Sequence, residues 1–285
     1  MKQQRQKTEL VNVPTTSIRP HALRAFSYAV PIGALGGLIG LGGAEFRLPV
    51  LAGPLRYTAH QAVPLNLAVS LVTVTTALMT RGWTLSPATL RPFMVAIAAL
   101  IAASVVTAFS GVALAGRLSQ TQLERTILVL LVSIGTALMI EGVLPTTIPG
   151  LLPAHPIRHL GAGILAGLAI GLVSSLLGVA GGELIIPTLM FIFGADIKTA
   201  GTASLLISLP MVLVGVLRYA RRGAFGERRD LVQTIAPMGV GSVIGAILGG
   251  VLAGIVPPAL LKIGLGIILI VSALRIFHHT RARQH

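Results

Sequence analysis

Gly40-Leu41-Gly42-Gly43-Ala44-Glu45-Phe46-Arg47-Leu48-Pro49 is the stretch that decides the fold, and a second copy follows as Gly178-Val179-Ala180-Gly181-Gly182-Glu183-Leu184-Ile185-Ile186-Pro187. The copies lie 138 positions apart, and each interrupts apolar sequence with small residues, one carboxylate and a downstream proline. Broken backbone at membrane depth persists only where it is buried in protein or lines a wet cavity. The duplicated break therefore predicts a transport site.

The rest of the chain is apolar enough for a bilayer. Of its 285 residues 54% are hydrophobic and 11% are charged, and the mean hydropathy is +0.87. This composition predicts an all-α integral membrane protein, because a soluble domain could not hide so much apolar surface. Eight segments approach the ~20 apolar residues that a crossing helix needs: 27–45, 62–80, 93–115, 126–144, 160–179, 201–219, 231–254 and 259–277.

The 138-residue offset continues beyond the break, for example from Ser70 to Ser208 and from Arg91 to Arg229. We expect two homologous halves of four spans each, and an even span count predicts parallel halves. The expected boundaries are a basic cytosolic extension (1–26), a first membrane repeat (27–145), a Pro-rich connection (146–159), a second membrane repeat (160–277) and a basic cytosolic tail (278–285).

The formal charge of +14 is distributed unevenly along this topology. With eight spans, the cytoplasmic side holds 16 of the 22 Lys and Arg residues, among them Arg81, Arg91 and Arg158. The other face keeps Arg47, Arg56, Arg117, Arg125, Lys198 and Lys262. This bias is typical of cytoplasmic loops and not of a nucleic-acid footprint. We expect an inner or plasma membrane location, with the lipid bilayer as partner, no nucleic acid and both termini in the cytoplasm.

Each break predicts a helix, a glycine-rich interruption near 42–45 or 180–183, and a second short helix that starts near Pro49 or Pro187. Proline is acceptable in the first turn of a helix but not in its interior. The sequence leaves open whether the piece is a re-entrant hairpin or a kinked span. Glycines at four-residue spacing, such as Gly33 and Gly37, are more typical of close helix packing.

Polar residues near the breaks are candidates for binding a substrate. Asn66, Ser70 and Thr73 follow i, i+4, i+7 spacing and share one helical face. The predicted substrate site comprises Gly42, Gly43, Glu45, Arg47, Asn66, Ser70, Gly181, Gly182, Glu183, Thr202, Ser204 and Ser208.

A membrane-depth carboxylate is costly and therefore suggests function. Three alternatives stay open for the charged residues. Glu45 and Glu183 could cap the following helix, they could carry protons, or Glu45 could pair with Arg47. Hydroxyl and amide groups could serve only to join helices.

Enzymatic chemistry has little support in this sequence. The chain has no cysteine, no paired-His zinc spacing and no His or Lys placed to activate an intramembrane serine. We therefore expect no catalytic residue, no metal and no cofactor.

The two motifs together resemble the TauE/SafE family of multi-pass permeases over about residues 27–277. The matching positions are Gly40, Gly42, Gly43, Pro49, Gly178, Gly181, Gly182 and Pro187. The chain departs from the pattern at Ala44, Ala180, Glu45 and Glu183. The resemblance implies a permease that exports a small anion such as sulfite or an organosulfonate. The alternatives are a proton- or cation-coupled carrier that uses Glu45 and Glu183, and a membrane scaffold subunit; a homo-oligomer is left open.

Overall fold

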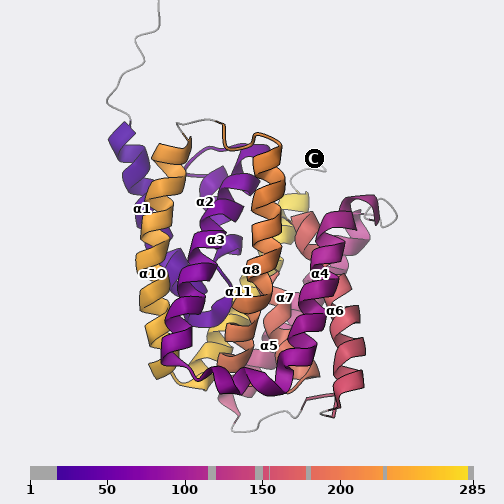
Figure 1. Cartoon of the computed structure of the whole chain (residues 1–285). Coiled ribbons are helices and arrows are strands. Elements are labelled where there is room, and N and C mark those ends of the chain that lie inside the picture. The colour runs from indigo at the N-terminus through magenta and orange to yellow at the C-terminus, as the bar shows by residue number, and fades with distance from the viewer. Residues whose placement is uncertain are drawn as a thin grey trace, which may run out of the picture.

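A computed structural model of the chain describes residues 18–114, 120–144, 150–153, 155–177, 181–226 and 230–281, and this part is helical with no strand. The first half contains α1 (Ile18–Leu35), the π-helix η2 (Gly36–Gly40), α2 (Ala44–Ala52), α3 (Ala59–Thr84), the 3₁₀ helix η3 (Pro87–Phe93), α4 (Met94–Leu114) and α5 (Gln120–Val143). The second contains α6 (Pro156–Leu177), α7 (Gly182–Pro187), η5 (Thr188–Ile192), α8 (Ile197–Arg221), η6 (Leu231–Ile235), α10 (Ala236–Ile255) and α11 (Pro258–Arg281). Figure 1 shows them as one helical bundle.

Six helices of the described chain are long and apolar enough to cross a membrane: His21–Gly40, Gln61–Thr84, Ala88–Thr107, Pro156–Ser174, Ile197–Arg221 and Leu231–Ile255. Their outer faces carry exposed apolar side chains such as Leu165 and Val251, as expected where lipid is the solvent. The predicted crossings at 126–144 and 259–277 form α5 and α11, whose apolar parts are the shorter Leu131–Val143 and Pro258–Leu274. Eight crossings thus remain a prediction.

The glycine-rich breaks reverse the chain. A Cβ on Gly43 would lie 2.9 Å from Ile32 Cγ2, and Leu51 of α2 shares a core cluster with Ala25 and Ala29 of α1. Helix α2 therefore runs back along α1 as a re-entrant hairpin.

The second break repeats the reversal. Gly181 lies against Ile170 and Ser174 of α6. At the other end of this hairpin, the Leu151 amide donates to the Phe191 carbonyl over 2.9 Å, which brings η5 back to the segment before α6. The structure thus selects re-entrant hairpins over kinked spans.

The hairpins begin earlier than predicted. Helix α2 starts at Ala44 and α7 at Gly182, each five residues before its proline. The reason is that Gly43 and Gly181 both adopt φ of +74°, where glycine has no steric penalty, so the turn is complete at the glycine. The proline then stands inside the short helix or at its end, and its missing N–H leaves the helix without one i to i+4 bond.

The small-residue interpretation of the other glycines is confirmed. Helix α1 packs along α10, where a Cβ on Gly37 would lie 2.5 Å from the Ala246 carbonyl oxygen. Helix α6 packs along α4 in the same way, with Gly167 against Leu100 and Ala103. These two pairs form the left and right flanks of the bundle in Figure 1. Each joins a helix before residue 145 to one after it, so the two halves interlock.

Helices that correspond at the 138-residue offset run in opposite directions. At one end of α3, Arg81 bonds the start of α8 at Lys198, whereas Leu67 near the other end touches Gly215. In α5 and α11, Gly135 packs on Gly266 and Gly142 on Ala259, so this pair is also antiparallel. The expectation of parallel halves is therefore wrong. Each hairpin adds a short return pass, which makes the number of passes per half odd.

The return passes also change which end of the bundle each loop occupies. Helix α1 begins and α11 ends at one end (Figure 1). Arg56, which follows α2, lies at this end and not on the opposite face, because Tyr57 contacts the His21 ring. Arg91 and Arg158 lie at the other end, where α4 and α6 begin. The assignment of Arg91 and Arg158 to the side of the N-terminus was wrong, because the eight-span count did not include the return passes of the hairpins. Arg117 lies outside the described residues.

Candidate functional site

The two breaks meet inside the bundle. A Cβ on Gly182 would lie 3.0 Å from the Leu41 carbonyl oxygen, and one on Gly40 would overlap the backbone of Gly201 in α8. Gly42 and Gly43 therefore lie next to Gly181 and Gly182 although they are far apart in sequence. This backbone contact brings together both glycine clusters of the predicted site.

Arg47 on α2 is fully buried and bonds to neutral groups. Its guanidinium nitrogens donate to Asn66 Oδ1 at 3.3 Å, Ser70 Oγ at 2.8 Å, Thr73 Oγ1 at 3.0 Å and Ser242 Oγ at 3.4 Å. The predicted polar face of α3 therefore converges on this one side chain. No carboxylate lies within ion-pair distance of Arg47 among the described residues, so it does not form the pair with Glu45 that the sequence left open.

Several buried polar atoms here have no hydrogen-bond partner in the described part of the chain. They are both Glu45 carboxylate oxygens, Arg47 Nε, Asn66 Nδ2, Ser174 Oγ and Ser204 Oγ. A buried polar group without a partner costs about 1–3 kcal/mol. Native structures retain such groups mainly where they act on a ligand or on water. The cluster is thus equipped to bind a polar molecule.

Glu45 and Glu183 lie close enough to repel each other electrostatically, and Arg47 attracts Glu45. Glu183 Oε1 accepts a 2.6 Å hydrogen bond from Ser272 Oγ of α11. Glu45 and Glu183 both stand in the first turn of their short helices, and the Glu45 carboxylate lies by its own backbone N–H, whereas the hydrogen bond of Glu183 goes to α11. Both carboxyl groups face the interior.

The remaining predicted residues, all on α8, do not share one environment. Ser204 and Ser208 of α8 are buried. Thr202 does not join Arg47, because its hydroxyl accepts a 3.1 Å bond from Arg81 and donates to the Lys198 carbonyl. Lys198, at the start of α8, donates to the Gly254 carbonyl.

Arg81 is a second fully buried arginine that sequence reasoning placed in a cytoplasmic loop. Nε donates to the Gly37 carbonyl over 2.9 Å and Nη2 to the Leu38 carbonyl over 2.6 Å. Both carbonyls belong to η2, at the end of the α1–η2 helix, where carbonyls lack partners from a following turn. The face of α3 that carries Asn66, Ser70 and Thr73 continues to Ala77 and Arg81 at helical spacing, and this signal could have found it.

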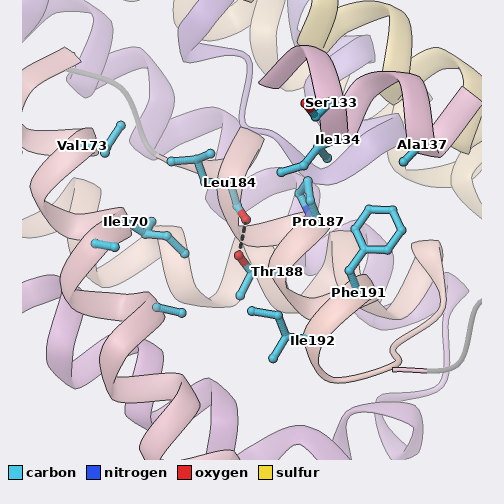
Figure 2. A pocket seen from close by; sticks show the side chains of 12 residues that line it. Ser133, Ile134, Ala137, Ile170, Val173, Leu184, Pro187, Thr188, Phe191 and Ile192 are labelled. Carbon is cyan, nitrogen blue, oxygen red and sulfur yellow. Dashed lines mark hydrogen bonds between the residues drawn. The ribbon is translucent and has the colours of Figure 1, made fainter. Parts of the chain in front are cut away.

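A separate cavity of about 450 Å³ lies behind α7, between α5 and α6. Figure 2 shows Leu184, Pro187 and Thr188 in the middle, with Ile170 and Val173 of α6 to the left and Ile134 of α5 at the upper right. Its lining is almost wholly apolar, and the Thr188 hydroxyl there is already bonded to the Leu184 carbonyl at 2.7 Å. None of the twelve predicted site residues lines this cavity. It is therefore distinct from the polar cluster.

A comparison with protein families supports the resemblance seen in the motifs. The family described as "Sulfite exporter TauE/SafE" matches residues 2–138 and 163–285. No curated protein and no solved structure matches the chain.

Proposed function

The chain belongs to the TauE/SafE sulfite exporter family of membrane transporters, and on that premise we propose that it exports a small anion, sulfite or an organosulfonate. The observation that carries this proposal is Arg47, a buried cation whose hydrogen-bond partners are all neutral. A buried positive charge without a bonded carboxylate favours an anionic ligand. The four terminal N–H groups of Arg47 already donate to these neutral partners, so its Nε–H, which has no partner among the described residues, is the donor left for an oxyanion.

The substrate would lie where the hairpins meet. Gly42, Gly43, Gly181 and Gly182 let the backbone approach closely. The unpartnered Asn66 Nδ2 and Ser204 Oγ supply donors, and Ser70 and Ser208 complete the polar wall. Thr202 would not contact the substrate, because its hydroxyl bonds Arg81.

We further propose that the halves are an inverted repeat related by an axis in the membrane plane, as in other transporters built from broken helices. Antiparallel α3 and α8 at the centre support this arrangement. The end of the bundle at which α1 starts carries exposed Arg24, Arg56, Arg221 and Arg222. We assign this end to the cytoplasm of a cell whose inner or plasma membrane holds the protein.

Flux into proteoliposomes tests the anion site. Wild-type protein should move radiolabelled sulfite faster than a neutral solute of similar size, and sulfate and sulfoacetate define the range. Arg47→Gln should lower sulfite flux at least about tenfold, since it removes the charge and several hydrogen bonds worth ~1 kcal/mol or more each. Arg47→Lys should recover part of it, because a lysine keeps the charge but not the planar fork.

Arg158→Gln is the matched control, since Arg158 is exposed at the end of α6 remote from the hairpin contact. Its flux should equal that of the wild type. Wild-type rates in Arg47→Gln would remove Arg47 from the site. Sealed vesicles that move none of the anions would favour the scaffold alternative.

A further inference from the structure

The two carboxyl groups of the site are not equivalent. Glu183 accepts a short hydrogen bond from the Ser272 side chain, whereas no side chain among the described residues donates to either oxygen of Glu45. A donated hydrogen bond stabilises the ionised form of a carboxyl group, and burial without donors favours the protonated form. Two adjacent buried carboxyl groups that repel each other will not both be ionised. The geometry therefore puts the shared proton on Glu45 and leaves the charge on Glu183.

The other charged groups around α2 and α7 are already accounted for. Arg81 donates to the Gly37, Leu38 and Lys198 carbonyls and to Thr202, so its positive charge is met by the partial negative charge of the η2 carbonyls and not by a carboxylate. On α11, Lys262 pairs with Glu141 of α5 at 2.6 Å. His159 of α6 packs edge-on against Phe193, at the far end of the hairpin. Arg47 is thus the cation beside the pair, and it lies on the Glu45 side.

These charges balance when the site is empty. Arg47 contributes one positive charge, Glu183 contributes one negative charge, and protonated Glu45 contributes none. An incoming monoanion would leave one uncompensated negative charge in a buried setting, which is costly. Taking one proton from water onto the Glu183 carboxylate restores neutrality.

We infer that each anion crosses together with one proton carried by Glu183, with Glu45 as the permanently neutral member of the pair and Ser272 as the positioning residue. This inference rests on the proposed function and specifies its coupling. It also assigns a role to α11, which the substrate prediction did not include. The Ser272 bond holds Glu183 ionised until the anion arrives, and release of the anion returns the proton to water.

The test measures protons and charge moved per sulfite in sealed vesicles, with a trapped pH indicator and a potassium diffusion potential. Sulfite carries some protons of its own, so variants are compared with the wild type under the same conditions. Glu183→Gln should move one proton fewer per sulfite. In Glu183→Gln, the ratio of sulfite concentrations across the membrane should depend more strongly on the potential than in the wild type. The additional factor should be roughly 50 per 100 mV, which corresponds to one more charge moved per sulfite.

Glu45→Gln provides the discriminating comparison, because a neutral amide replaces a carboxyl group that is already neutral. Its number of protons per sulfite should stay at the wild-type value. Ser272→Ala should shift the midpoint of the flux–pH profile upward by about one unit, since the ionised form of Glu183 loses a donor. Ser133→Ala, on α5 and outside the site, should leave both readouts unchanged.

The outcomes separate the two proposals. Absence of sulfite flux in wild-type vesicles overturns the proposed function. Normal flux with the same number of protons per sulfite in Glu183→Gln overturns the proton inference alone. Loss of the coupled proton in Glu45→Gln but not in Glu183→Gln would reverse the assignment and so contradict it.

Discussion

At the scale of single residues, the proposed site rests on two kinds of position. Arg47, Asn66 and Ser204 supply polar groups that are fully buried. Gly43 and Gly181 supply a backbone conformation, φ of +74°, that turns each hairpin. A side chain is strained in this conformation even where space exists, and here space is also lacking. The glycines are therefore as specific a requirement as the charged groups.

Gly43→Ala and Gly181→Ala should each lower the free energy of unfolding by about 1–3 kcal/mol and reduce sulfite flux, because a Cβ would meet Ile32 or Ser174. Gly239→Ala is the control, since Gly239 is helical in α10 and a Cβ there meets no atom within 4 Å. It should be neutral or stabilising by ~0.5–1 kcal/mol. Denaturation in detergent measures all three, and equal stability of Gly43→Ala and Gly239→Ala would count against the strained turn.

At the scale of elements, two buried arginines bond the first hairpin to the neighbouring helices. Arg47 ties α2 to α3 and α10, and Arg81 ties the end of η2 to α3 and α8. Position 185, which corresponds to Arg47 at the offset, is Ile, and position 219, which corresponds to Arg81, is Tyr. The second hairpin instead bonds α11 through Glu183 and Ser272 and borders the apolar cavity of Figure 2. The two hairpins are thus alike in backbone and different in attachment.

Arg81→Gln should destabilise the protein by at least about 1–3 kcal/mol, the cost of one buried group left unsatisfied, because the Gly37 and Leu38 carbonyls lose their donors. Arg91→Gln, in exposed η3, is the control and should unfold at the wild-type temperature. Thermal unfolding in detergent compares the two. A shift of the same size in both would mean that Arg81 does not hold the hairpin.

At the scale of the whole molecule, reversal of the chain at each break fixes the topology. Helices α1, α3 and α10 run in one direction. Along α1 and α10, Gly33 meets Ser242 and Gly37 meets Ala246; along α10 and α3, Gly250 meets Thr80 and Gly254 meets Thr84. Corresponding helices of the two halves are antiparallel, so each half presents the opposite end to a given membrane face. Under the proposed inverted repeat, one set of contacts could open to either side, which alternating access requires.

Single cysteines in this natively cysteine-free chain test the topology. Cysteines at Gly53 and Gly226 should be labelled from the same side of the membrane, because the return of α2 brings 53 to the end where α10 begins. A cysteine at Thr89 should be labelled from the other side. Eight simple crossings predict the opposite side for Gly53. Labelling of position 53 from the side opposite to position 226, or of position 89 from the same side as position 226, would overturn the re-entrant arrangement.

The sequence by itself determined the chemistry and the location of the breaks. Hydropathy identified a helical membrane protein, the duplicated motif identified the family, and helical spacing put Asn66, Ser70 and Thr73 on one face. These features are local, because they depend on apolar runs and on periodicity along one helix. The glycines at positions 43 and 181 indicated a break in the helix, which is also a local feature of the sequence.

The tertiary structure alone decided the relative direction of the two halves and the hydrogen-bond partners of the buried side chains. The offset between two copies is the same for parallel and inverted halves, so only the turn at φ of +74° and the packing of α3 on α8 could distinguish them. Likewise, a sequence does not show that Arg81 reaches the end of η2 or that Ser272 reaches Glu183, 89 positions away. Such contacts arise from the packing of distant helices, which local pattern does not encode.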